Sequence, residues 1–96
     1  MRAPLFALLL AASLPLAGCG HKATEADCSF ILDRNVEVQM KQMAIRDPAA
    51  IEKRKQEIRT ELKGALDGCV GKRITDGILA CVARAQTASD IDSCMR

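Results

Sequence analysis

The sequence predicts an all-α fold of about four helices, arranged as two consecutive helical hairpins over residues 27–96. Three observations favour this class. Apolar residues recur at spacings of three and four along most of this region, which is the period of an amphipathic helix. No segment sustains the polar–apolar alternation of a strand. Only two of the 96 residues are aromatic, although strands are enriched in aromatic and β-branched residues.

The first helix is expected over residues 27–46. One apolar stripe recurs along it at helical spacing and consists of Leu32, Val36, Met40 and Met43. Asp27 is a residue type that caps helix N-termini. Asp47 and Pro48 then end this helix and begin the next one, because aspartate caps a helix and proline fits its first position.

The second helix is expected to continue to about Leu66, and Gly68 and Gly71 are expected to end it. Its apolar stripe consists of Ile51, Ile58, Leu62, Ala65 and Leu66. Basic and acidic residues are interleaved on the opposite face. We therefore interpret the basic concentration at residues 53–55 as the solvated face of an amphipathic helix, rather than as a contact for anionic lipid or glycan.

A third helix is expected from an apolar stripe formed by Ile74, Ile78, Cys81, Val82 and Ala85. Gly77, close to its expected start, is unfavourable inside a helix. Residues 87–90 then resemble a capping box in form, with aspartate in place of the usual glutamate or glutamine. We expect them to begin a short last helix that carries Ile91 and Cys94.

Residues 1–18 differ in character from the rest of the chain. Arg2 precedes an apolar run from Leu5 to Ala17, and small residues follow. This order is typical of a secretory signal peptide, which is removed from the mature protein. The run is also shorter than the roughly 20 apolar residues that a transmembrane helix needs. We therefore expect residues 1–18 to be a signal peptide.

The end of this run, Leu16-Ala17-Gly18-Cys19, resembles the lipobox of bacterial lipoproteins. The resemblance implies that the thiol of Cys19 carries a diacylglycerol and that cleavage leaves this cysteine at the mature N-terminus. It also implies that the new amine is often acylated. Two or three acyl chains are enough to hold a protein stably on a membrane.

The residue after the lipidated cysteine carries a second implication of this resemblance. Lipoproteins are usually retained at the inner membrane by an aspartate there, whereas this chain has Gly20. In a Gram-negative host this favours the outer membrane, facing the periplasm or the surface. Residues 19–26 are small and polar, so we expect a tether leading to a domain over residues 27–96. His21 is expected to be solvated in this tether.

Four further cysteines lie in the mature chain, at Cys28, Cys69, Cys81 and Cys94. An even number in a small exported domain predicts disulfides. Folding the first two helices back on each other brings Cys28 and Cys69 together, and the second hairpin does the same for Cys81 and Cys94. We therefore prefer the pairs Cys28–Cys69 and Cys81–Cys94. The pairs Cys28–Cys81 with Cys69–Cys94, and four free thiols, stay open as alternatives.

Several kinds of site are not indicated by the sequence. There is no Cys-x-x-Cys pair, so neither a thioredoxin-type redox centre nor a zinc knuckle is expected. The region after the tether lacks histidine, the commonest general base, and Glu57 and Glu61 are interpreted as a solvated helix face. A net charge of +2 and the absence of Trp and Tyr argue against a nucleic-acid binder. We expect no catalytic residue, no metal site and no cofactor.

The leading functional hypothesis is a non-enzymatic interaction or structural module of the cell envelope, anchored by lipid on Cys19. Small lipoproteins with a similar architecture often serve as assembly partners, pilots or inhibitors, which implies an envelope protein as partner. The alternative is a periplasmic carrier of a small ligand or metal that uses the cleft between the hairpins. A redox enzyme is a third hypothesis, which would require a readily exchanging disulfide.

Overall fold

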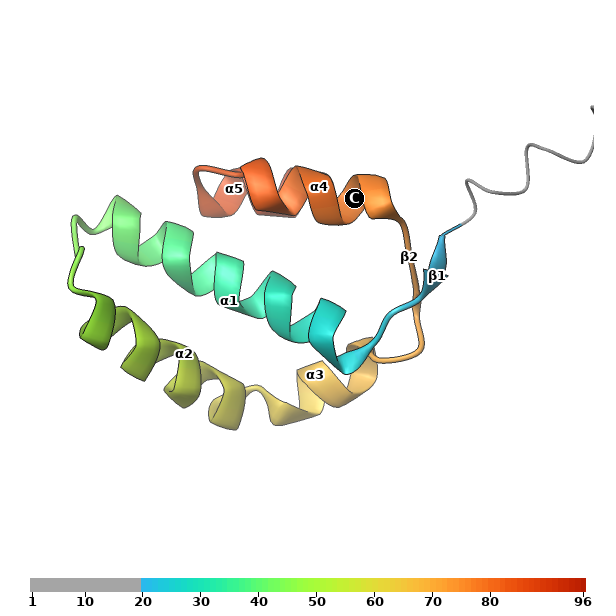
Figure 1. Ribbon diagram of the computed structural model, residues 1–96, viewed down its shortest axis with the longest axis horizontal. Coiled ribbons are helices and arrows are strands. Elements are labelled where there is room, and N and C mark those ends of the chain that lie inside the picture. Colours follow the sequence, from blue (N-terminus) through green and yellow to red (C-terminus); the bar gives the residue numbers. More distant parts are fainter. Residues whose placement is uncertain (1–19) are drawn as a thin grey trace, which may run out of the picture.

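The computed structural model describes residues 20–96, which form five helices and one two-stranded antiparallel sheet (Figure 1). The elements in chain order are β1 His21–Lys22, α1 Glu25–Gln42, α2 Pro48–Glu61, α3 Lys63–Cys69, β2 Arg73–Ile74, α4 Asp76–Arg84 and α5 Ala88–Cys94. The predominantly helical class is confirmed. The all-α expectation is wrong in one respect, because β1 pairs with β2.

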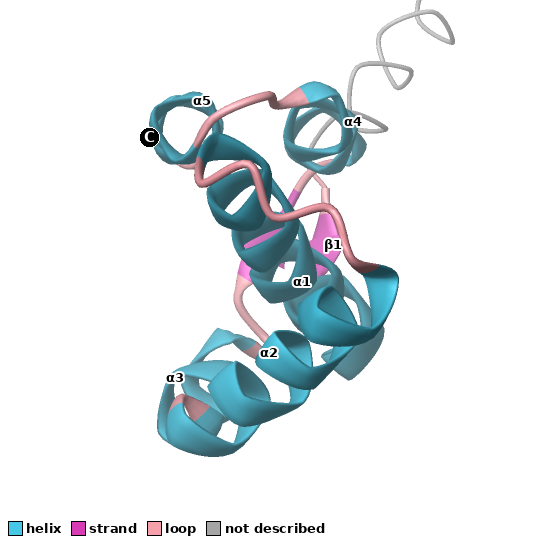
Figure 2. Ribbon diagram, turned by 90° about the vertical axis from the view of Figure 1, so that its left-hand side faces the viewer, coloured by secondary structure: helices cyan, strands magenta, loops and turns pink. Residues whose placement is uncertain are grey.

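Helix α1 lies at the centre of the described fold. It contacts α2 and α3 on one side and α4 and α5 on the other (Figure 1). Figure 2 shows the same order nearly end-on, with α1 between the two groups of helices. The expected four helices become five in the described residues, because the second expected helix is divided into α2 and α3.

The central position of α1 explains its weak amphipathic pattern. Val38 is buried in a core with Val82, Ala85 and Ile91. Val36 and Met40 are also buried in α1. Residues two apart on a helix differ by about 200° in direction, so these two lie on the side of α1 opposite Val38. A helix that is buried on two sides cannot show a single narrow apolar stripe.

Both ends of α1 differ from the sequence prediction. The N-cap is Thr24 rather than Asp27, and the helix begins at Glu25. The helix ends at Gln42, and Ala44 in the following turn has a φ of 60°. This left-handed conformation is incompatible with continuing a right-handed helix. The predicted end at residue 46 is therefore too late.

Helix α2 begins as predicted, and its expected continuation is interrupted at Leu62. Asp47 caps α2 by accepting a hydrogen bond from the Ala49 N–H at 3.2 Å. The hydroxyl of Thr60 donates to the Gln56 carbonyl at 3.1 Å, a bond that often bends helices. Leu62 has a φ of −106° and a ψ of 25°, outside the usual helical range. The chain therefore changes direction before α3.

The third expected helix begins later than its apolar stripe suggested. Ile74 belongs to β2 and is buried in a second core with Ala23 and Cys28. Helix α4 begins after Thr75, whose hydroxyl accepts the Ile78 N–H at 3.1 Å. The last helix, α5, begins after Thr87 as predicted.

Candidate functional site: the anchor junction and two grooves

The residues that directly follow Cys19 in the sequence are part of the folded unit. In the antiparallel ladder, His21 pairs with Ile74 and Lys22 pairs with Arg73. This ladder fixes the first described residues against the segment between α3 and α4. We call the ladder and its neighbouring residues 20–27 the anchor junction.

Ala23 extends the pairing beyond the ladder. Its N–H donates to the Lys72 carbonyl at 2.6 Å, and its carbonyl accepts the Gly71 N–H at 2.8 Å. The side chain is only 4% exposed, which makes Ala23 a core residue. The expectation of a tether over residues 19–26 is therefore wrong for the part that the structure describes. Short pairing of this kind gives too few residues for a periodic sequence signal.

Gly20 is packed so closely that no other residue fits without a shift. Its φ is +77°, in the region that favours glycine. A Cβ at this position would lie 2.9 Å from the Ile74 carbonyl carbon and closer still to its oxygen. Gly20 therefore has a structural reason to be glycine, independent of any sorting signal after Cys19.

His21 takes part in a polar cluster at the start of α1. Its Nε2 lies 2.9 Å from Asp27 Oδ2, and its Nδ1 lies 3.8 Å from Asp76 Oδ1. The expectation that His21 is only a solvated tether residue is therefore wrong, although its side chain is 43% exposed. Asp27 also completes a capping box with Thr24. Its carboxylate accepts the Thr24 N–H at 3.0 Å.

These hydrogen bonds favour the ionised form of Asp27. The backbone N–H of Thr24 is the main cause that holds the pKa of Asp27 below its ordinary value of 3.8, and the hydrogen bond from His21 acts in the same direction. A helix N-terminus also attracts negative charge. The cluster is thus suited to fixing the first turn of α1.

Two disulfides join the cysteines in the preferred pairs. Cys28 is bonded to Cys69, with the Cα atoms 6.1 Å apart. Cys28 is buried at 3% exposure beside the anchor junction. The bond connects the start of α1 to the end of α3, and it therefore holds the outer helices to the central one.

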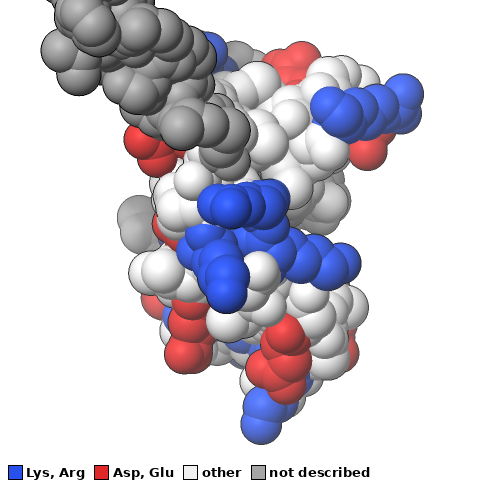
Figure 3. All heavy atoms as spheres, turned by 90° about the vertical axis from the view of Figure 1, so that its right-hand side faces the viewer, with Lys and Arg blue, Asp and Glu red and all other residues white. Residues whose placement is uncertain are grey.

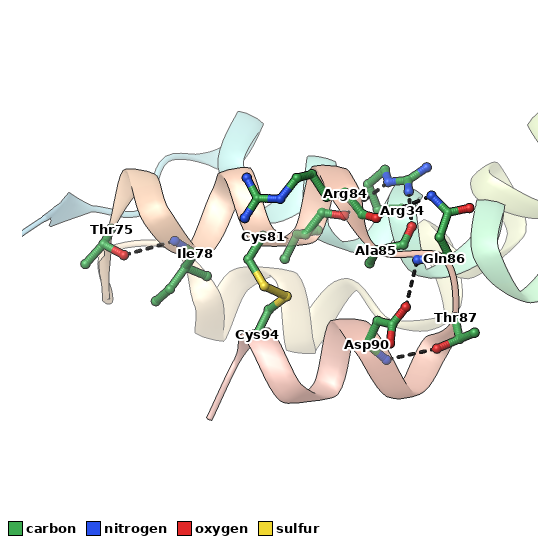
Figure 4. Close-up of a disulfide and its surroundings, with 11 residues drawn as sticks. Arg34, Thr75, Ile78, Cys81, Arg84, Ala85, Gln86, Thr87, Asp90 and Cys94 are labelled. Carbon is green, nitrogen blue, oxygen red and sulfur yellow. Dashed lines mark hydrogen bonds between the residues drawn. A yellow bond between two sulfur atoms is a disulfide. The ribbon is translucent and has the colours of Figure 1, made fainter.

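The second disulfide joins Cys81 of α4 to Cys94 of α5 (Figure 4), with the Cα atoms 5.8 Å apart. At the other end of these helices, Thr87 caps α5 by accepting the Asp90 N–H at 3.0 Å. The Asp90 carboxylate accepts the Gln86 N–H at 3.0 Å. Helices α4 and α5 are therefore held together by the disulfide and, at their connection, by these hydrogen bonds.

An apolar groove of about 230 Å³ runs beside the first disulfide. Its lining residues are Cys28, Ile31, Leu32, Asn35, Leu62, Ala65, Leu66, Cys69 and Met95. None of them is charged, and Leu62 and Met95 are 42% and 47% exposed. A groove of this composition can receive apolar side chains, as partner-binding surfaces do.

A larger groove, of about 460 Å³, lies between α1, α2 and the α4–α5 connection. The Arg34 guanidinium on its wall donates to the Val82 and Ala85 carbonyls at 3.3 and 2.6 Å. Glu37 pairs with Arg34 at 3.0 Å and with Lys55 at 3.3 Å. Arg34 of α1 therefore supplies donors to carbonyls at the end of α4, which need partners from outside the helix. The Glu37–Lys55 ion pair joins α1 to α2.

The charges of α2 are also largely paired. Arg54 lies 3.2 Å from Glu57 and 3.9 Å from Glu61, so these two carboxylates share a cation. The Arg59 Nε donates to Asp33 of α1 at 3.1 Å. This hydrogen bond raises the pKa of Arg59 above its ordinary value. Lys53 and Arg54 are exposed, as expected for a solvated face, whereas Lys55 is partly buried and pairs with Glu37 of α1, so the interpretation is wrong for Lys55.

The chain matches no protein-family model, no curated protein and no solved structure. Within residues 20–96, no helix has both the length and the apolar character needed to cross a membrane. In the same part of the chain, no three His, Cys, Asp or Glu side chains are grouped so that they could hold a metal ion.

Cys19, the candidate lipidation residue, lies outside the described residues. Sequence reasoning missed the roles of Gly20 and His21 at the anchor junction. For the start of α1 the sequence does contain a signal, because Thr24-x-x-Asp27 has the same Thr-x-x-Asp form as residues 87–90. This form is typical of a helix that begins directly after the threonine, which is the observed start of α1.

Proposed function

We propose that this protein is a lipid-anchored lipoprotein of the bacterial cell envelope. The lipid is carried by Cys19, the signal peptide of residues 1–18 is removed, and the mature protein is directed to the outer membrane. In this proposal it is a non-enzymatic interaction module that binds an envelope protein.

The observation that carries the proposal is the position of the folded unit relative to the lipobox. Gly20 is the residue immediately after the lipobox cysteine, and it packs closely against Ile74. Cleavage before Cys19 would therefore keep Gly20 and the rest of the anchor junction in the mature protein. The lipid would sit one residue away from a fixed backbone, so the domain would be held close to the membrane.

The disulfides support an exported location. Disulfides persist in oxidising compartments such as the bacterial periplasm and are rare in the cytosol. In this proposal each bond closes one helical hairpin, α1 with α2–α3 and α4 with α5. The loop lengths correspond to about 4 and 3 kcal/mol of stabilisation, which is a large share for a small domain.

The interaction role is supported by the apolar groove beside Cys28 and Cys69. Its uncharged lining and the exposed side chains of Leu62 and Met95 suit the apolar side chains of a protein partner. The alternative, a small-ligand or metal carrier, would use the larger groove between α1, α2 and the α4–α5 connection. The ion pairs that already occupy that groove favour the interaction role.

The lipid anchor is tested by the Cys19→Ser variant, produced in its native host and analysed by membrane fractionation. We expect the variant to accumulate unprocessed or to leave the membrane fraction, because no thiol is available to carry the lipid. The matched control is the Cys81→Ser/Cys94→Ser double variant, which also replaces cysteine by serine but keeps Cys19, and which is expected to be processed and to stay on the membrane. Unchanged processing and fractionation of Cys19→Ser would contradict the proposal.

A further inference from the structure

Three basic residues lie in the ladder of the anchor junction or next to it: Lys22 and Arg73 in the strands, and Lys72 directly before β2. We call them the ladder basic face. Lys22 and Arg73 are directly opposite in the ladder register, so their side chains project from the same face of the two strands. Lys72 precedes Arg73, and all three residues are exposed. Figure 3 shows Lys and Arg side chains gathered on this end of the molecule, where β1 and β2 lie in Figure 1.

The ladder basic face differs in its pairing from three of the four basic residues of α2. Arg54, Lys55 and Arg59 each form an ion pair with a carboxylate. Among residues 20–96, by contrast, the three members of the ladder basic face form no ion pair with a carboxylate. The guanidinium of Arg73 donates to the Gly20 carbonyl at 3.3 Å. The face therefore carries uncompensated positive charge.

The position of the ladder basic face relative to Cys19 determines which surface lies next to its positive charge. Lys22 is three residues after Cys19, and an extended residue spans at most about 3.6 Å. The backbone between them passes through Gly20, which is held against Ile74. The backbone of Lys22 thus stays within roughly 11 Å of the lipidated residue, a distance comparable to the Debye length at physiological salt, and Arg73 lies opposite Lys22.

We propose that the ladder basic face binds the anionic phospholipid headgroups of the membrane that carries the lipid anchor. This inference rests on the proposed lipidation of Cys19. Basic residues beside an acyl anchor supply a second membrane contact. Each one strengthens binding to an anionic surface about fivefold.

The contact also fixes an orientation. The anchor junction lies at the start of α1, and the turn between α1 and α2 lies at the other end of that helix (Figure 1). With the ladder basic face on the headgroups, the turn at residues 43–47 points away from the membrane. The long helices then present their sides, including the apolar groove, to proteins in the surrounding compartment.

The test uses the mature, lipidated protein reconstituted into vesicles and compares the acetylation rates of individual lysines by mass spectrometry. One set of vesicles contains phosphatidylcholine alone, and the other contains added phosphatidylglycerol. We expect Lys22 and Lys72 to react at least fivefold more slowly on the anionic vesicles, because headgroups cover them. The rate at Lys53 on α2 is the internal reference and should not change. Raising the salt to about 1 M, where the Debye length is about 3 Å, should remove the protection.

A matched pair of variants separates this contact from general charge effects. Arg73→Gln removes one charge from the face and keeps both reporter lysines, so protection of Lys22 and Lys72 should fall severalfold. Arg84→Gln removes an exposed charge from the end of α4 and should leave their protection unchanged. Equal loss of protection in both variants would overturn the proposal, because the effect would then follow total charge.

The outcomes distinguish the ladder basic face from the lipid anchor. Flotation with both kinds of vesicle, combined with equal lysine rates on both, would overturn the contact and leave the anchor intact. Failure to float with phosphatidylcholine vesicles would count against the anchor. In that case, salt-sensitive flotation with phosphatidylglycerol vesicles would support the contact, and no flotation would overturn it.

Discussion

The two sides of α1 are held by different forces. On the α4–α5 side, four buried apolar residues form a closed core: Val38, Val82, Ala85 and Ile91. On the other side, α2 and α3 contain no buried residue. Those helices are joined to α1 by the Cys28–Cys69 bond, by ion pairs such as Arg59–Asp33, and by partly buried apolar side chains such as Leu66.

This difference shows how a very small domain can add helices without enlarging its core. Apolar burial stabilises by roughly 25 cal/mol per Å², and a short chain has little surface to bury. A disulfide between helix ends stabilises without using core volume, because it restricts the unfolded chain. We therefore expect α2 and α3 to depend on their covalent bond more than α5 depends on its own.

Removing the disulfides one at a time gives the largest expected effect. Cys28→Ser/Cys69→Ser should lower the free energy of unfolding by about 4 kcal/mol, and Cys81→Ser/Cys94→Ser by about 3 kcal/mol. Urea unfolding measures both values. Hydrogen exchange should show that the first variant loses protection in α2 and α3 while α4 keeps its own. Loss of protection in α4 first would contradict the comparison.

A pair of isoleucine substitutions compares apolar packing on the two sides. Ile91→Ala empties a buried position at 2% exposure and should cost about 3 kcal/mol. Ile51→Ala in α2, where the side chain is half-buried, should cost about 1 kcal/mol. Thermal unfolding of the two variants measures the difference. Equal costs would mean that α2 is packed as tightly as α5.

The ion pairs across α1 and α2 should contribute little. Asp33 and Arg59 have side-chain exposures of 19% and 34%, and partly exposed pairs contribute less than about 1 kcal/mol. A double-mutant cycle with Asp33→Ala and Arg59→Ala should give a coupling energy in this range. The coupling should shrink at about 1 M salt. A coupling energy that is large and independent of salt would show instead that α2 is held electrostatically.

The smallest expected effect is the pH dependence of the anchor junction. The folded-state pKa of Asp27 is lowered, so its ionised form stabilises the fold above the ordinary value of 3.8. This contribution is lost as the pH falls through the folded-state pKa. Asp27→Asn should therefore flatten the stability profile below about pH 4. The matched variant Asp67→Asn in α3 should leave the profile unchanged, and identical profiles for Asp27→Asn and the native protein would contradict the assignment.

Helix starts could be predicted where a capping residue and a periodic stripe agree. Asp47 with Pro48 and Thr87 illustrate this agreement, since each begins a helix as expected. The hydrophobic pattern misled at Ile74, because its spacing from Ile78 fits a helix while its contacts place it in a strand. A spacing of four residues between Ile74 and Ile78 does not show whether Ile74 is buried as part of a helix or as part of a strand.

The anchor junction could not be predicted because its cause is tertiary. The ladder between Lys22 and Arg73 joins segments about fifty residues apart, and two-residue strands carry no alternation. The φ of Gly20 and the packing of Ala23 follow from that pairing. The lipidation of Cys19 stays a prediction from the lipobox.

The intact mass of the protein purified from its native host membranes tests the central claim most directly. The account predicts a chain that begins at Cys19, carries the added mass of a diacylglyceryl group with or without an N-linked acyl chain, and has no free thiol. An acyl-free chain that retains residues 1–18 and all five reduced cysteines would contradict both the anchor and the disulfide-closed hairpins.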